Sequence, residues 1–130
     1  MFTVEFYSTN EGRSPVKDFM ETLPSKLRSK TLRAIRFLRE DGNQIKPPFS
    51  MPLGDGLFEL RIIFSSDIVR VIYFYLEGKI IVLTNGFIKK QQKTPRNEIE
   101  LALKRRKLFL ERICKNEKEN NKKKVQTSII

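Results

Sequence analysis

The sequence predicts an α+β domain, in which N-terminal helices and a C-terminal helix accompany an antiparallel-rich sheet of about four strands. Three observations lead to this fold class. Residues 2–6 alternate between apolar and polar side chains, residues 14–42 carry apolar side chains at helical spacing, and three strand-like runs follow within residues 57–87. A chain of 130 residues has the length of a single domain, which we place at residues 1–114.

The part of the chain before residue 57 is predicted to hold one strand and two helices. The strand is the alternating segment 2–6. Ser14 and Pro15 start the first helix, because serine caps a helix and proline loses no hydrogen bond at the first helical position. The second helix spans residues 25–41, where an apolar stripe ends just before a glycine. Residues 43–56 are rich in proline and glycine and are predicted to be a loop.

The second half of the domain is predicted to hold three strands and a helix. Residues 57–64, 68–76 and 79–87 are rich in Ile, Val, Phe and Tyr, and the short turns between them predict an antiparallel meander. Thr94 and Pro95 have the pattern of a helix start, with threonine as the cap. An apolar stripe follows and predicts the last helix.

Charge and missing residue types limit the possible functions. The chain has 26 Lys and Arg against 15 Asp and Glu, and its net charge of +11 favours polyanionic partners. Nucleic acid comes first among these, before an acidic protein or an anionic membrane. There is no histidine and one cysteine, Cys114, which excludes Cys/His zinc sites, Ser-His-Asp triads and two-histidine ribonuclease chemistry. We expect neither a metal nor another cofactor.

The same inventory predicts where the protein works. A lone cysteine cannot form an internal disulfide, which favours the reducing cytoplasm. The chain shows no signal peptide and no apolar run near the ~20 residues that span a bilayer, so we expect no membrane association. Residues 115–130 are polar and basic without apolar periodicity, and we predict a disordered tail there.

Strand register predicts which side chains share a face of the sheet. If both short turns contain two residues, Arg61 lies opposite Ile72, and Arg70 lies opposite Asn85. Opposed residues share a face, and this face is expected to be open to solvent. The side chains placed on it are Glu59, Arg61, Arg70, Phe74, Asn85 and Phe87. The other face is predicted to be covered by the helices and holds Phe58, Leu60, Ile62, Val71, Tyr73, Ile80 and Val82.

The open face has the chemistry of a phosphate site. Guanidinium groups bind phosphate through two parallel hydrogen bonds, and an aromatic ring such as that of Phe87 can stack on an unpaired base. Arg33 and Arg36, on the basic outer face of the second helix, are candidates for further RNA contacts. The alternatives are a surface ion pair between Glu59 and Arg61, and solvated charges on the helix and on the lysine loop at residues 89–93.

Four segments carry a family resemblance. They are Leu-Phe-Glu-Leu-Arg at residues 57–61, Arg-Val-Ile-Tyr-Phe at 70–74, Asn-Gly-Phe-Ile-Lys-Lys at 85–90 and Lys-Thr-Pro at 93–95. Together with the helix that follows, they resemble the HigB-like branch of the RelE/ParE toxin superfamily. The resemblance extends over residues 1–114, and the last two segments are its most specific part.

The resemblance implies a RelE-like fold and a toxin of a type II toxin–antitoxin system. Such a toxin is a ribosome-dependent endoribonuclease that cleaves mRNA in the ribosomal A site and inhibits translation. The implied partners are the ribosome, mRNA and a HigA-like antitoxin with a helix-turn-helix domain, which alone contacts operator DNA. Many relatives have a histidine where this chain has Asn85, so proton transfer by histidine is excluded here.

Metal-free RNA cleavage needs a base, an acid and stabilisation of the charge on phosphorus. We expect Arg61 and Arg70 to supply the charge stabilisation. Since histidine is absent, the groups that transfer protons must be Glu59, a lysine or a tyrosine. A lysine among like charges gives up its proton more easily, which favours the loop lysines over Glu59 as the base without a choice among them. These lysines are Lys89, Lys90 and Lys93. The alternative is a non-enzymatic inhibitor of the same fold, such as a ParE-like gyrase inhibitor, that acts by occupying its target.

Overall fold

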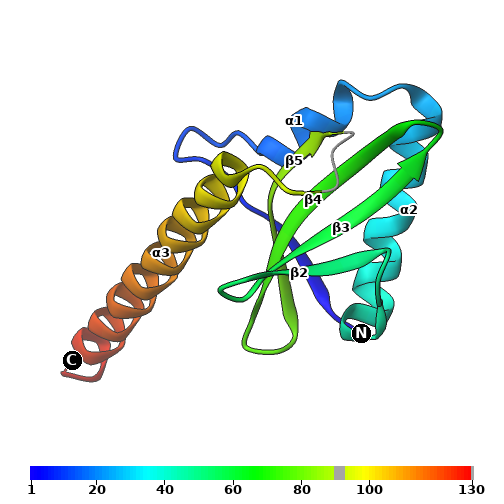
Figure 1. Cartoon of the computed structure of the whole chain (residues 1–130). Helices are drawn as coiled ribbons and strands as arrows, with labels where there is room; N and C mark the ends of the chain where they lie inside the picture. The colour runs from blue at the N-terminus through cyan, green and yellow to red at the C-terminus, as the bar shows by residue number, and fades with distance from the viewer. Residues whose placement is uncertain (90–92, 130) are drawn as a thin grey trace.

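The fold is built on one sheet with helices on both of its faces (Figure 1). The structure, a computed structural model, describes residues 1–89 and 93–129. Alternating and helical apolar patterns produce their elements where the sequence predicts them, with strand ends that differ by one or two residues. In chain order the elements are β1 (Thr3–Phe6), α1 (Pro15–Glu21), α2 (Ser25–Asp41), the 3₁₀ turn η1 (Gly42–Gln44), β2 (Ser50–Gly54), β3 (Leu57–Phe64), β4 (Asp67–Leu76), β5 (Ile80–Ile88) and α3 (Arg96–Ile129).

The sheet is mixed and has one strand more than predicted. Its order is β1-β5-β4-β3-β2, with β1 parallel to β5 and the other neighbours antiparallel. The predicted α+β class is confirmed, but β2 lies in residues 43–56, where the predicted loop is wrong. Pro52 is the reason for the error, because proline usually interrupts a strand. It is tolerated here because β2 is an edge strand, where one side of the backbone needs no ladder partner.

Helices cover both faces of the sheet. α1 and α2 bury one face with Val16, Leu27 and Leu38. The first turns of α3 cover the opposite face, where Ala102 is completely buried with strand residues such as Phe74. The prediction of an open face is therefore wrong for the part that α3 covers. Sequence patterns predict that α3 is amphipathic, but they do not say which sheet face it packs on.

The face of each strand residue follows from the observed register. Arg61 lies opposite Arg70, not opposite Ile72 as predicted, because the β3–β4 turn is Ser65-Ser66. This difference of two positions leaves Arg61 on the predicted face. In the next turn, Leu76 pairs with Ile80, so that turn contains three residues and not two.

A β-bulge then restores the predicted face for the end of β5. The register shifts between Ile72 and Tyr73, which leaves Thr84 as the extra residue of β5. Asn85 and Phe87 consequently share the face of Arg70, as predicted, with Phe87 as the direct partner of Arg70. Ile80 and Val82 lie before the bulge and face α3, so their predicted position on the α1–α2 face is wrong.

α3 continues beyond the end of the predicted domain. Its backbone is helical to Ile129, which differs from the disordered tail predicted for residues 115–130. A helix satisfies its own backbone hydrogen bonds, and the Lys, Glu and Gln residues of this segment favour helix formation. The later turns of α3 extend away from the sheet (Figure 1). In the described part of the chain, no helix is both long and apolar enough to cross a bilayer.

Candidate functional site

A buried ion pair lies at the centre of the face that carries the predicted site. Arg70 Nη1 lies 3.0 Å from Glu59 Oε1, and both side chains have 0% exposure. They lie on neighbouring strands, which the β3–β4 register brings together. The two charges compensate each other in a place where either charge alone would be costly. Both residues are predicted site residues, and the structure places them under the surface.

Thr94 completes this cluster from the start of α3. Its hydroxyl donates a short hydrogen bond to Glu59 Oε2, and the residue is buried. Both carboxylate oxygens of Glu59 are therefore engaged, one by Arg70 and one by Thr94. The sequence pattern predicts only a capping role for Thr94, because Glu59 lies 35 residues away along the chain and only the fold brings the two together. We call Glu59, Arg70 and Thr94 the buried cluster.

Three predicted basic residues lie at the edge of the buried cluster. Arg61 keeps 16% of its side chain exposed, and its Nε lies 3.5 Å from Glu59 Oε1. Lys89 directly follows β5, and its backbone N–H donates to Ile68. Lys93 is exposed and directly precedes Thr94, so the Thr94–Glu59 hydrogen bond fixes its backbone beside β3. We call Arg61, Lys89 and Lys93 the basic triad. Lys90 lies outside the described residues.

Asn85 and Phe87 are buried on the same face. Asn85 Nδ2 donates to the Glu98 carboxylate at 3.0 Å and to the Glu98 carbonyl at 3.3 Å, which ties β5 to α3. Phe87 packs in the core under α3 and does not form a stacking surface. Gly86 lies between them because a Cβ there would come within 2.5 Å of the Phe19 ring of α1. Glu98 is a further residue of this face, and its contact with Asn85 is not predicted by the sequence pattern.

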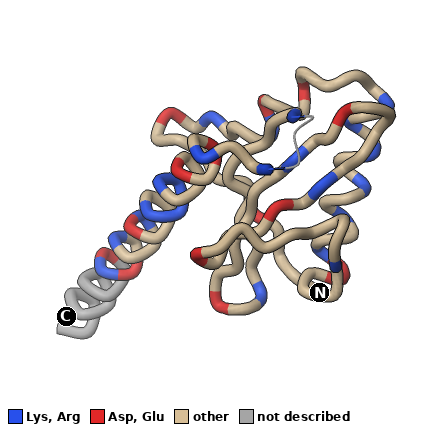
Figure 2. Tube along the Cα trace, viewed as in Figure 1, with Lys and Arg blue, Asp and Glu red and all other residues tan. Residues whose placement is uncertain are grey.

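Arg33 and Arg36 belong to a different surface. Both are exposed on α2 and line a shallow cavity of about 220 Å³ with Phe37 and Glu40. Lysines and arginines recur along α2, whereas basic and acidic residues alternate along the described part of α3 (Figure 2). The basic residues predicted from sequence thus divide into the triad beside the buried cluster and a second group on α2.

Burial decides which tyrosines could take part in proton transfer. Desolvation raises the pKa of Tyr73, whose hydroxyl lies 2.6 Å from Ser50 Oγ, and burial also raises the pKa of Tyr75. Both hydroxyls therefore stay protonated at neutral pH. Both pack on the other face of the sheet, among the residues that α1 and α2 cover. In the described part of the chain, His, Cys, Asp and Glu form no group of three that could hold a metal ion.

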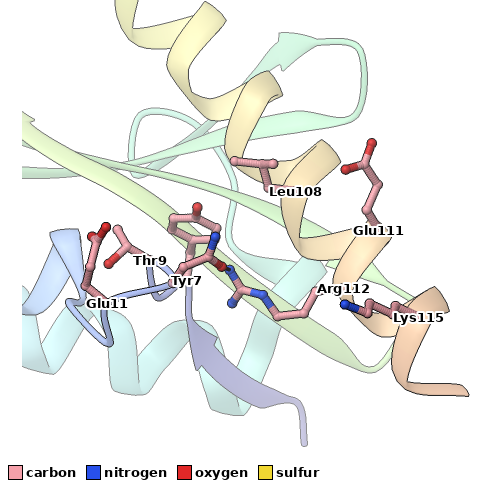
Figure 3. A pocket seen from close by; sticks show the side chains of 8 residues that line it. Tyr7, Thr9, Glu11, Leu108, Glu111, Arg112 and Lys115 are labelled. Atoms are coloured by element: carbon pink, nitrogen blue, oxygen red, sulfur yellow. Dashed lines mark hydrogen bonds between the residues drawn. The ribbon is translucent and has the colours of Figure 1, made fainter. Parts of the chain in front are cut away.

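Another cavity lies between α3 and the segment after β1. It has a volume of about 430 Å³, and Arg112 projects into it from α3 toward Tyr7 (Figure 3). Arg112 donates to the Ser8 carbonyl at 2.9 Å and to Asn10 Oδ1 at 3.1 Å, and its guanidinium lies 5.8 Å from the centre of the Tyr7 ring. These contacts hold α3 against the N-terminal segment, so we assign Arg112 a structural role.

Arg112→Ala is expected to lower the free energy of unfolding by about 1–2 kcal/mol, because it removes two hydrogen bonds from a charged donor and a cation–π contact. Urea unfolding followed by circular dichroism measures this loss. Lys115→Ala, one turn further along α3 at the same cavity, is the matched control and should change stability by less than about 0.5 kcal/mol. Equal effects of the two substitutions would contradict the structural role of Arg112.

Comparison with known proteins identifies relatives. Residues 18–107 match a family described as phage-derived Gp49-like proteins. Two curated proteins named "Probable endoribonuclease HigB1", from the Mycobacterium tuberculosis strains CDC 1551 / Oshkosh and ATCC 25618 / H37Rv, are each 32% identical to this chain over 107 residues. The matched region covers 80% of this chain and 81% of each relative. It includes β3, β4 and β5, which carry most of the candidate site.

Proposed function

The chain belongs to the family of phage-derived Gp49-like proteins, and on this premise we propose that it is an endoribonuclease toxin of a toxin–antitoxin pair. Similarity to two proteins named as probable HigB1 endoribonucleases supports the proposal. The finer proposal is that it cleaves mRNA in the ribosomal A site and thereby inhibits translation in the cytoplasm. Its proposed partners are the ribosome, mRNA and a HigA-like antitoxin. Only the antitoxin would contact operator DNA.

The observation that carries the proposal is the basic triad anchored on the buried cluster. Arg61, Lys89 and Lys93 come from three separate segments that the fold brings to one end of the sheet. Neighbouring strands are about 4.8 Å apart, so about 10 Å separate the Cα atoms of Arg61 and Phe87 across two strands. Lys89 lies two residues beyond Phe87, which is about 7 Å further along the strand direction. Long basic side chains can bridge this span to a single phosphate. The contact between Arg61 Nε and Glu59 Oε1, at 3.5 Å, helps to orient the Arg61 side chain.

In the proposed reaction, Arg61 binds the non-bridging oxygens of the scissile phosphate and stabilises the negative charge that develops there. Lys89 or Lys93 transfers protons. The 2′-oxygen of the ribose loses its proton and attacks phosphorus, and the bond from phosphorus to the 5′-oxygen breaks as that oxygen gains a proton. Glu59 and Arg70 act beneath the site as positioning residues, because both are fully buried.

The purified chain is expected to cut mRNA on programmed ribosomes much faster than the same mRNA free in solution, because this small site depends on the ribosome to align the 2′-oxygen. Primer extension on the mRNA detects the new ends. Robust cleavage of free RNA that ribosomes do not stimulate would contradict the ribosome-dependent mechanism. Growth arrest and translation block without new ends would support the non-enzymatic alternative.

A further inference from the structure

An apolar groove runs between α2 and the β2–β3 side of the sheet. It has a volume of about 410 Å³ and is lined mainly by Ala34, Phe37, Ile45, Phe49, Leu60 and Arg61. A second cavity of about 240 Å³ shares Ala34, Phe37, Phe49 and Arg61 with it, so the two form one continuous surface. Phe37 and Phe49 keep 53% and 61% of their surface exposed. Exposed apolar surface that is contiguous and rimmed by polar residues is typical of interaction sites.

The two phenylalanines are held by rigid backbone. Phe37 lies within α2. The Phe49 backbone donates to the Lys46 carbonyl at 3.0 Å and accepts from the Arg61 N–H at 2.8 Å. These contacts position the Phe49 ring at the mouth of the groove without burying it. Binding of a partner would therefore cost the groove little conformational entropy, which favours affinity.

Charge around the groove selects the partner. Lys30, Arg33, Lys46 and Arg61 line the two cavities, and no carboxylate does so among the described residues. A second copy of this chain, at +11, would be repelled. Apart from these basic residues and Gln44, the lining is aliphatic and aromatic, which matches apolar side chains of a protein better than the polar edges of RNA bases. The occupant that fits is an acidic segment with apolar anchors.

We infer that this groove docks an acidic amphipathic helix of the partner protein, with its apolar side chains against Phe37 and Phe49 and its carboxylates against the basic rim. This inference rests on the proposed function, because that partner is the antitoxin. Arg61 lines the groove and also belongs to the basic triad, so the groove adjoins the candidate site. Inhibition then follows from the bulk of the bound partner, which restricts access to that site.

The test uses the full chain and a labelled acidic peptide of about 15 residues, with leucines at i, i+3, i+4 and i+7 and glutamates on the other face. Fluorescence anisotropy should show binding at least tenfold tighter than that of a peptide of equal composition whose leucines share no face. Phe49→Ala should weaken binding by about tenfold or more, and Phe37→Ala provides a second variant on a different element. Leu110→Ala, which truncates an exposed apolar residue on α3, should leave binding unchanged.

Equal binding of the two peptides, or unchanged binding in both phenylalanine variants, would overturn the inference. A single-stranded uridine oligonucleotide is the competing probe. If it displaced the peptide and lost affinity in Phe49→Ala, the groove would be an RNA site instead. Peptide binding is measured without ribosomes or mRNA. Loss of groove binding with intact cleavage therefore rejects only the docking site, and loss of cleavage with intact groove binding rejects only the proposed nuclease.

Discussion

Arg70→Met is expected to lower the free energy of unfolding by about 3–5 kcal/mol, because it leaves the Glu59 carboxylate buried without its main countercharge. Methionine retains most of the side-chain volume, so the loss reports on charge and not on a cavity. Urea unfolding monitored by circular dichroism measures it. If the variant is as stable as the natural chain, Glu59 and Arg70 are not a stabilising pair in solution.

Two further variants isolate the effect of burial. Glu59→Gln combined with Arg70→Met removes both charges and should recover most of the lost stability, since replacing a whole buried pair is far less costly than breaking it. Arg96→Met breaks the exposed pair between Arg96 and Glu100, whose Nε–Oε1 distance is 3.5 Å, and should cost less than about 0.5 kcal/mol. A similar loss in Arg96→Met and Arg70→Met would contradict the role of burial.

Arg61→Ala is expected to reduce ribosome-dependent cleavage at least about 100-fold, because it removes the charged fork proposed to stabilise the transition state. Stability should change by less than about 1 kcal/mol, since Glu59 keeps its contacts with Arg70 and Thr94. Arg61→Lys keeps the charge but loses the planar fork, so its cleavage rate should lie between those of the natural chain and Arg61→Ala. Single-turnover cleavage on programmed ribosomes measures all three rates.

The control for Arg61→Ala is Arg39→Ala, in the last turn of α2. This variant should cleave at the rate of the natural chain. Arg39 is exposed and has the same charge, so it corrects for the change in net charge. If Arg61→Ala and Arg39→Ala cleave equally fast while both fold and bind ribosomes, Arg61 does not contact the scissile phosphate. The proposed site would then lie on another basic surface, of which α2 is the strongest candidate.

Side-chain alternation along strands is the part of the candidate site that sequence predicts well. Glu59 and Arg61 are two residues apart on β3, so they share a face in any register. Arg70 joins them because the error in the predicted β3–β4 turn is two positions, which preserves the face. Asn85 and Phe87 are also placed correctly, but only because the longer β4–β5 turn and the bulge at Thr84 compensate each other.

Burial is the part that sequence does not predict. An arginine is usually exposed, and nothing local to β4 shows that Arg70 is enclosed. Its enclosure depends on the register of β3, on the position of α3 and on the hydroxyl of Thr94, which is 24 residues further along the chain. Local patterns predict elements and faces, whereas long-range packing decides which charged groups of a face remain available to a substrate.

The parallel pairing of β1 with β5 sets an order on how the newly made chain can fold. Thr3 pairs with Ile80 and Phe6 with Leu83, so the first strand to be synthesised can pair only after residues 80–83 have been made. Until then the apolar residues of β1 have no sheet to join. The basic triad is later still, because Lys93 follows β5 and is positioned only when Thr94 reaches Glu59. A growing chain therefore cannot assemble this site while the ribosome is still making the strands beneath it.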